Sequence, residues 1–424
     1  MAEIKAFRGL RYTETAGEIG KLCCPPYDII SKEQSKIYYK ENPYNIIRLE
    51  LPRSLSYDNE FDVYEAAGKL LREWLEKGIL KNDDAESIYV YEMQFDVFGQ
   101  KKSVVGFIPL VKVEEISNGI VLPHEETLSK DKSDRLNLMN SAGCNFSQIY
   151  SLFTDESGEA SSLLADVIKT APTSAFTDGD DVMHRLWVVS DTAFIEKITA
   201  LLADKKLYIA DGHHRYETAL AYKAANSGKG SADYVPMMLV NIESDGLVIF
   251  PTHRIVRDLE RYEQGEIISK CGQYFDITQG LTRNAAETAL DLAFKNDEKA
   301  FVLYNGEYTF LKLKNTDIMR EFLPDKSKAL RELDVSVLHT LVLERIFGID
   351  KENMANQVNL TYTRSTDEAI SAVDEKRANC SFLLNACRLH EIGDVVSAGE
   401  KMPQKSTYFY PKLTTGLVMN QIVK

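Results

Sequence analysis

The stretch from Leu207 to Leu220 constrains the fold more than any other part of this sequence. Apolar residues 207–210 are followed by Asp211-Gly212-His213-His214-Arg215, and residues 216–225 then follow a helical pattern. An apolar run that ends in a polar turn and continues as a helix predicts a strand, a tight loop and a helix. An amphipathic stripe over 195–202 adds a helix before the strand. The unit we expect is therefore helix, strand, loop, helix.

The rest of the sequence predicts a mixture of helices and hairpins. We expect hairpins over 87–112 and 300–313, the second with a turn at Asn305-Gly306, and a strand pair near 235–250 with a turn at 244–246. Helical spacing predicts helices over 58–77 and 334–347. The fold class is therefore α+β (mixed α/β). For 424 residues we expect two domains, 1–255 and 256–424, the second being an α/β half.

Charge and hydropathy exclude several classes of partner. The net charge is −14 and the pI about 5.2, which argues against a broad nucleic-acid face because such faces are basic. The sequence has no uncharged apolar run of membrane-spanning length, and residues 1–5 lack the apolar core of a signal peptide. We therefore expect a cytoplasmic protein with a small-molecule partner.

The loop after the 207–210 strand concentrates groups that bind phosphate. The free N–H groups at the start of the following helix favour an anion, and Gly212 allows a close turn of the backbone. Arg215 suits phosphate oxygens, and Asp211 suits a hard cation such as Mg²⁺. The alternative is an ordinary helix cap in which Arg215 pairs with Glu217 or another acid. Zinc is a weaker alternative, because no further ligand at suitable spacing accompanies the two histidines.

Two further clusters carry charged groups. In the stretch 123–135, Glu125 and Glu126 are candidates for a general base and Arg135 for a phosphate contact, although a solvated helix start explains the same residues. In 399–416, Lys405, Ser406 and Thr407 combine a cation with hydroxyls as phosphate loops do, without Walker A glycines. The alternatives there are an aromatic edge strand and a Lys405 pair with Glu400.

We predict catalytic and binding roles from these three clusters. The predicted catalytic residues are Asp211, His213, His214, Glu125 and Glu126, and Asp211 is also the predicted metal ligand. The predicted phosphate-binding residues are Gly212, Arg215, Arg135, Lys405, Ser406, Thr407 and the lesser candidates His253 and Arg254. We expect the Lys405–Thr407 segment and the Asp211–Arg215 loop to bind the same ligand.

Five motifs in this order resemble the DUF1015 family of uncharacterised bacterial and archaeal proteins over essentially the whole chain. They are Pro25-Pro26-Tyr27-Asp28, His124-Glu125-Glu126-Thr127, the 209–219 segment, Pro251-Thr252-His253-Arg254 and Met402-Pro403-Gln404-Lys405-Ser406-Thr407.

The Asp211–Arg215 motif also resembles that of free serine kinases, which belong to the ParB/sulfiredoxin-like superfamily. This resemblance covers roughly residues 192–225 and implies a ParB-like module whose loop binds nucleotide phosphates. It implies a phosphotransferase that forms phosphoserine from free L-serine, with Mg²⁺ and with ADP, ATP or pyrophosphate as donor. Asp211 matches the motif's acid, whereas Glu125 and Glu126 are assigned to the base by chemistry. The alternatives are a phosphoserine phosphatase and a non-catalytic nucleotide-binding or nucleic-acid-binding protein.

Overall fold

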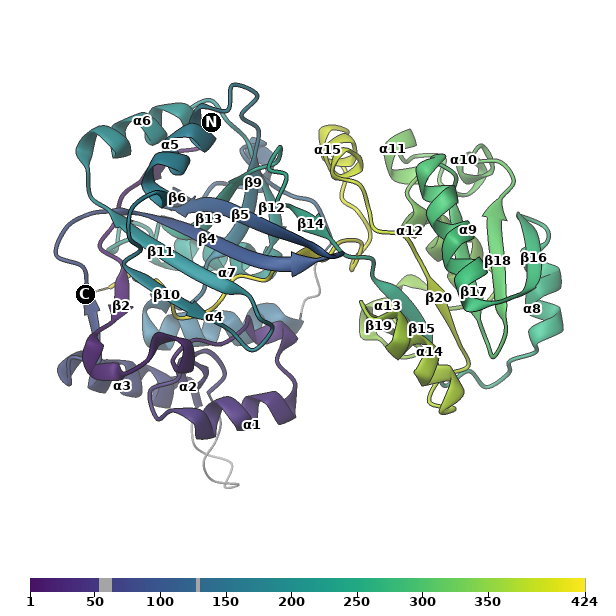
Figure 1. Ribbon diagram of the computed structural model, residues 1–424, viewed down its shortest axis with the longest axis horizontal. Coiled ribbons are helices and arrows are strands. Elements are labelled where there is room, and N and C mark those ends of the chain that lie inside the picture. The colour runs from purple at the N-terminus through teal and green to yellow at the C-terminus, as the bar shows by residue number, and fades with distance from the viewer. Residues whose placement is uncertain (53–62, 127–129, 424) are drawn as a thin grey trace. The chain divides into compact units, whose positions relative to one another are not determined.

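The computed structural model describes residues 1–424 except 53–62, 127–129 and 424 (Figure 1). The first residues of the predicted 58–77 helix, and Thr127, lie outside the described residues. The chain divides into two compact units, each built from separate segments. The first unit comprises Met1–Pro123, Thr127–Leu247 and Pro411–Lys424, and the second comprises His124–Glu126 and Val248–Tyr410.

The first unit is built on a mixed sheet of ten strands among the described residues. Its main spatial order is β10 (Ser174–Thr177), β11 (Met183–Val189), β4 (Ile88–Val97), β5 (Gln100–Ile108), β13 (Tyr234–Asn241), β9 (Ile149–Phe153), β12 (Leu207–Asp211) and β7 (Val121–Pro123). β6 (Leu110–Lys112) joins β13 and pairs with β1 (Ile4–Lys5). Most pairs are antiparallel, but β12 runs parallel to β7 and β13 runs parallel to β9.

Two of the buried clusters in the first unit hold most of its helices. The larger joins the sheet to α5 (Glu159–Ile168), α6 (Thr192–Leu202) and α7 (His213–Asn226). The other gathers α2 (Ile47–Glu50), α3 (Val63–Glu76) and α4 (Lys130–Ala142), while α1 (Lys32–Glu41) begins at a capping box of Ser31 and Gln34. Short 3-10 turns are η1 (Glu14–Ala16), η2 (Ile19–Lys21), η3 (Tyr27–Ile29) and η4 (Ile116–Asn118).

The end of the chain belongs to the first unit because it pairs with early strands. β22 (Asn420–Gln421) pairs with β8 (Cys144–Asn145), and Met419 bridges Leu10 beside the pair of β2 (Leu10–Tyr12) and β3 (Leu80–Asn82). The division predicted after residue 255 is continuous in sequence, whereas the compact units are not. Long-range strand pairing, which leaves no local pattern, causes this difference.

The second unit is an antiparallel six-stranded sheet with helices on both faces. The order is β16 (Phe275–Leu281), β18 (Tyr308–Leu313), β17 (Ala300–Tyr304), β20 (Cys380–Leu383), β15 (His253–Val256) and β19 (Leu360–Thr363). Phe301 and Leu303 pack with α8 (Gln264–Cys271), α10 (Ile318–Phe322), α12 (Asp334–Val337), η5 (Leu338–Glu344) and α13 (Lys351–Asn356). Ala300 and Val302 pack with α9 (Arg283–Lys295) and α14 (Thr366–Asp374). This alternation buries both faces.

The remaining elements of the second unit are short. They are α11 (Lys328–Arg331), α15 (Leu389–Ser397), and the strand pair of β14 (Val248–Ile249) and β21 (Phe409–Tyr410).

The mixed α/β fold is confirmed, as are the β4–β5 and β17–β18 hairpins and the α6–β12–α7 unit. The strand pair predicted near 235–250 is wrong: β13 pairs with β5, β6 and β9, and β14 pairs with β21, because the chain leaves the first unit after Leu247. The predicted 334–347 helix is present but changes to π geometry at Leu338 and ends at Glu344. Within the described residues, no helix is long and apolar enough to cross a bilayer.

Candidate functional site

The loop between β12 and α7 has the backbone that its sequence predicts. Gly212 adopts φ of +91° and is the N-cap of α7, which begins at His213. This φ favours glycine, and a Cβ atom at this position would lie 2.9 Å from Nε of Arg215 and would displace that side chain. The pairing of β12 with β9 shifts register between Ile209 and Asp211, as a bulge does. Asp211 therefore ends β12 at an irregular pair and lies directly before Gly212.

Asp211 is held between two cations. Nη2 of Arg215 donates to Oδ2 at 2.7 Å, and Nζ of Lys412 donates to Oδ1 at 2.5 Å. All three side chains are largely buried, with 10% to 16% of their surface exposed. Arg215 also donates through Nη1 to the carbonyl of Gln148. The first unit therefore contains a buried cluster with one carboxylate and two cations, which we call the Asp211 cluster.

The two cations determine the ionisation of Asp211. Burial alone would raise the pKa of this carboxyl, but Lys412 and Arg215, with a smaller effect from His213, bring it well below its ordinary value. Asp211 is therefore ionised at neutral pH and the three charges sum to +1. His213 and His214 open α7 beside this cluster and are half-buried.

The contacts of Asp211 oppose the predicted role as a Mg²⁺ ligand. Both carboxylate oxygens already accept hydrogen bonds from cationic groups, and these cations would repel a divalent ion. Within the described residues, no group of three or more His, Cys, Asp or Glu side chains is arranged to hold a metal. The role that fits Asp211 is to fix Arg215 and Lys412 at the start of α7.

Arg135 lies in the same unit and lines a pocket that also includes Glu50, Ser147, Arg215 and Thr218. Its guanidinium is 6% exposed, donates to Asp134 at 2.6 and 2.8 Å and to the Glu50 carbonyl at 2.8 Å, and stacks 4.2 Å from the Tyr27 ring. These contacts join α2 to α4. They oppose the predicted phosphate contact, because two carboxylates, Asp134 at 2.6 Å and Glu50 at 3.5 Å, already balance the charge of this guanidinium.

A second cluster, in the second unit, forms around Glu125. A short parallel bridge joins Glu125 to Met402 and brings it beside the turn that follows. Oε1 of Glu125 accepts from the Thr407 amide at 2.8 Å and from the Thr407 hydroxyl at 2.7 Å, and Oε2 accepts from the Lys405 amide at 3.2 Å. His124 Nε2 lies 2.7 Å from the Thr407 hydroxyl. The structure thus brings together Glu125, Lys405 and Thr407, which are predicted site residues; we call this the Glu125 cluster.

Other predicted residues in the second unit have different surroundings. Glu126 is exposed, and its backbone amide bonds to the Met402 carbonyl. The Ser406 hydroxyl donates to the Pro403 carbonyl at 2.5 Å, so it supports its own turn. Arg254 is 1% exposed and donates to the carbonyls of Thr252 and Lys405. These contacts oppose a direct phosphate role for Ser406 and Arg254, whose hydrogen bonds support the backbone.

His253 is also a structural residue in this unit. Nδ1 accepts from the Leu384 amide at 3.2 Å, and Nε2 lies 3.1 Å from the Thr366 hydroxyl. Burial, followed by the charge of Arg254, lowers the pKa of His253 to about 4. The imidazole is therefore neutral at pH 7 and cannot supply the predicted cationic phosphate contact.

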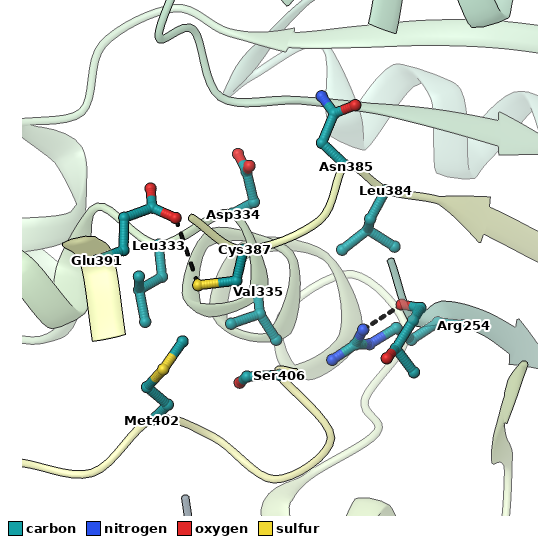
Figure 2. A pocket seen from close by; sticks show the side chains of 11 residues that line it. Arg254, Leu333, Asp334, Val335, Leu384, Asn385, Cys387, Glu391, Met402 and Ser406 are labelled. Carbon is teal, nitrogen blue, oxygen red and sulfur yellow. Dashed lines mark hydrogen bonds between the residues drawn. The ribbon is translucent and has the colours of Figure 1, made fainter. Parts of the chain in front are cut away.

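A small cavity lies behind the 402–406 segment. Arg254, Asp334, Cys387, Glu391 and Ser406 are among its lining residues (Figure 2), and its volume of about 20 Å³ is room for about one water molecule. Burial raises the pKa of Asp334 to about 7. This cavity is too small for a metabolite.

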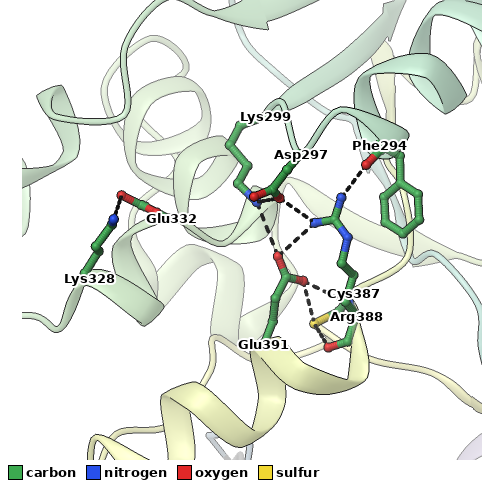
Figure 3. A network of polar contacts seen from close by, with 8 residues as sticks. All are labelled: Phe294, Asp297, Lys299, Lys328, Glu332, Cys387, Arg388 and Glu391. Carbon is green, nitrogen blue, oxygen red and sulfur yellow. Dashed lines mark hydrogen bonds and ion pairs between the residues drawn. The ribbon is translucent and has the colours of Figure 1, made fainter.

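A polar network fixes one wall of that cavity. Oε1 of Glu391 lies 3.3 Å from Nζ of Lys299 and 3.2 Å from Nη1 of Arg388, and Oε2 accepts a hydrogen bond from the Arg388 amide at 2.9 Å (Figure 3). Arg388 also reaches Asp297 at 3.0 Å, so the start of α15 is tied to the end of α9. The network therefore supports the structure of the second unit.

Sequence reasoning missed the second cation of the Asp211 cluster. Lys412 lies 201 residues after Asp211, and its only sequence signal is a basic residue beside Pro411 in an aromatic segment. The structure also bears on the two alternatives predicted for the cations. Arg215 pairs with an acid, as one alternative predicts, and that acid is Asp211. Glu400, the partner predicted for Lys405 in the other alternative, accepts from the Ser327 amide and pairs with Lys326.

Comparison with known proteins identifies the family. The sequence matches the family described as "Protein of unknown function (DUF1015)" over residues 4–336. No match was found among curated proteins.

Among solved structures, a conserved hypothetical protein from Pyrococcus furiosus has 14% identity and a TM-score of 0.35, covering 68% of this chain and 87% of its own. A free serine kinase in complex with AMP has 14% identity and a TM-score of 0.36, covering 68% and 83%. SbnI with a C-terminal truncation, from Staphylococcus aureus, has 11% identity and a TM-score of 0.37, covering 73% and 86%. At these TM-scores the structural similarity assigns neither an activity nor a site.

Proposed function

We propose that this chain, which belongs to the DUF1015 family, is a phosphotransferase that acts on a small hydroxylated metabolite, with free L-serine as the favoured acceptor. One observation carries the proposal: Lys412 and Arg215 converge on Asp211 at the N-terminus of α7. The proposed donor is ADP, ATP or pyrophosphate.

The Asp211 cluster has the charge and the position that a phosphate group requires. α7 is 14 residues long, so its first N–H groups and its positive dipole end favour an anion. Two cations around one carboxylate leave a net positive charge in a largely buried place, where electrostatic attraction is stronger than in bulk water. The carboxylate holds both cations in fixed positions, which lowers the cost of ordering them when a ligand binds.

The choice of serine rests on the sequence motif. Asp211-Gly212-His213-His214-Arg215 resembles the motif of free serine kinases in the ParB/sulfiredoxin-like superfamily. We therefore propose a ParB-like module around β12 and α7 that binds the phosphates of the donor. His213 and His214, at the start of α7, are proposed to contact the transferred group.

Glu125 is the proposed general base. In the transfer, the serine hydroxyl oxygen forms a bond to phosphorus, the bond from phosphorus to the leaving oxygen of the donor breaks, and the hydroxyl proton passes to a carboxylate. Of the two predicted bases, Glu125 is largely buried and lies beside the predicted phosphate-binding residues Lys405 and Thr407, whereas Glu126 is exposed. A base of this kind contributes a factor of about 10² to 10⁴ to turnover.

The test is an assay by phosphorus NMR of the full chain with L-serine or phosphoserine, combined in turn with ADP, ATP, CTP and pyrophosphate. We expect phosphoserine to form with at least one donor and expect Asp211→Asn to abolish it. Glu125→Gln should lose turnover by the factor given above, while Glu126→Gln should lose much less. Hydrolysis of phosphoserine without any transfer would establish the phosphatase alternative. Nucleotide binding with no turnover in either direction would contradict the proposal and favour a non-catalytic binding protein.

A further inference from the structure

The Lys405–Thr407 turn binds the carboxylate of Glu125 through several hydrogen-bond donors. Two backbone amides and the Thr407 hydroxyl donate to Glu125, at distances from 2.7 to 3.2 Å. His124 Nε2 adds a further polar group, 3.4 Å from Oε1 of Glu125. The Lys405 and Thr407 donors come from a chain segment 280 to 282 residues away from Glu125. The turn therefore has the donor set of an anion site, and a side chain of the same protein fills it.

The backbone of the turn accounts for this donor set. Lys405 has φ of +57°, a left-handed conformation that is uncommon for residues other than glycine. A left-handed residue between ordinary ones directs neighbouring N–H groups into one concavity, which commonly binds phosphate. Arg254 braces this conformation because it donates to the Lys405 carbonyl at 3.1 Å. The Lys405 side chain is exposed and therefore free to approach an external anion.

We propose that the Lys405–Thr407 turn is a receptor for a phosphate group, and that Glu125 occupies it in the ligand-free protein. A phosphate dianion would take over the Lys405 and Thr407 donors and release the Glu125 carboxylate. This inference rests on the proposed function for the identity of the phosphate-bearing ligand. It adds that phosphate binding frees the general base, so that the base becomes available only when a ligand is present.

A phosphate group can replace the Glu125 carboxylate in the turn without the loss of any hydrogen bond to the Lys405 and Thr407 donors. A carboxylate and a phosphate oxygen accept the same hydrogen bonds, and phosphate carries more charge and more acceptor atoms. The Lys405 ammonium would attract the incoming dianion. The Glu125 side chain is 12% exposed, so its displaced carboxylate has access to solvent.

Two variants of Glu125 test the inference in the full chain. Glu125→Gln removes the charge while it keeps the shape, and Glu125→Asp keeps the charge while it withdraws the carboxylate by one methylene. Titration calorimetry with inorganic phosphate and with pyrophosphate measures affinity without any turnover. We expect both variants to bind at least one of these anions about tenfold more tightly than the wild type. A tenfold gain corresponds to a receptor that is open about a tenth of the time in the wild type.

Glu400→Gln is the matched control. It removes one carboxylate close in sequence to the turn, but Glu400 bonds to the Ser327 amide and to Lys326 and not to the turn. We expect its anion affinity to stay within about twofold of the wild type. An equal gain in this control would overturn the inference, because the gain would then reflect net charge alone.

Circular dichroism establishes whether each Glu125 variant is folded, and either folded variant decides the test. Unchanged or weaker anion affinity in a folded variant would overturn the inference. Unfolding of both variants would also overturn it, because Glu125 would then be a structural brace that no ligand displaces. The inference and the proposed function fail separately: tighter phosphate binding with no transfer to serine refutes only the function, and transfer without tighter binding refutes only the receptor.

Discussion

Replacement of Lys412 by methionine tests the Asp211 cluster most directly. The substitution keeps the apolar stem of the side chain and removes the ammonium group that lies 2.5 Å from Oδ1 of Asp211. Arg215 remains on the other carboxylate oxygen at 2.7 Å, so Asp211 is left with one cationic partner instead of two.

The contacts in the structure set the size of the effect. Removal of one partner of a buried ion pair costs about 3–5 kcal/mol when the other charge is left uncompensated, whereas one hydrogen bond to a charged group contributes about 1.5–3 kcal/mol. Because Arg215 stays in place, we expect Lys412→Met to lower the free energy of unfolding of the first unit by about 2 kcal/mol. The same change should weaken pyrophosphate binding by a factor of about ten or more, since each 1.4 kcal/mol is about tenfold.

The chain offers a probe that is specific for this unit. Its two tryptophans, Trp74 in α3 and Trp187 in β11, both lie in the first unit. Urea unfolding followed by tryptophan fluorescence therefore reports on the unit that contains Asp211. A double-mutant cycle with Asp211→Asn isolates the Lys412–Asp211 coupling, which we expect to be about 1.5–3 kcal/mol.

The pH dependence of stability gives a second measurement. The pKa of Asp211 is lower in the folded chain than in the unfolded chain, so its ion pairs stabilise the fold above about pH 4 and this contribution is lost as the pH falls through the folded-state pKa. In Lys412→Met the folded-state pKa moves closer to the unfolded-state value, so the acid loss of stability should be smaller and should be complete at a higher pH. Unchanged stability, pH profile and pyrophosphate affinity in Lys412→Met would refute the role that we assign to the cluster.

Three further variants test individual features. Gly212→Ala should destabilise the first unit by about 1–2 kcal/mol and weaken pyrophosphate binding, because alanine is strained at φ of +91° and its Cβ would meet Arg215. Tryptophan-detected urea unfolding measures the stability and calorimetry measures the affinity. Unchanged stability and affinity would contradict the need for glycine at this position. The folded-state pKa of His253 is about 4, so the second unit should lose up to about 3 kcal/mol of stability between about pH 6.5 and 4, and His253→Asn should reduce this loss. Urea unfolding followed by far-UV circular dichroism at several pH values measures the loss. The same dependence of stability on pH in the wild type and the variant would refute this prediction. Lys405→Ala should change the free energy of unfolding by less than about 1 kcal/mol, because the side chain is exposed. It should weaken phosphate binding, and the loss of affinity should become smaller as the salt concentration rises. Calorimetry at two salt concentrations measures the affinity, and an affinity equal to that of the wild type at both would refute a contact between Lys405 and phosphate.

Part of the candidate site was predictable because it is local in sequence. An apolar strand, a glycine and a helical pattern follow one another within 14 residues, and each element depends on its own φ/ψ preferences and hydrophobic period. The α6–β12–α7 unit and the Gly212 turn therefore follow from the sequence. The β17–β18 hairpin is predictable for the same reason, since its turn residues Asn305-Gly306 lie between two runs rich in apolar and aromatic residues.

The sequence by itself determined the local units and the chemistry that each carries, and only the tertiary structure decided which charged groups meet. Lys412 reaches Asp211 across 201 residues, and Thr407 reaches Glu125 across 282. Burial was also decided by the tertiary structure: His253 and Arg254 are candidate phosphate-binding residues in the sequence but are only 3% and 1% exposed in the fold. Partner choice and burial depend on the path of the whole chain, because charges attract over distances in space and leave no periodic pattern in the sequence.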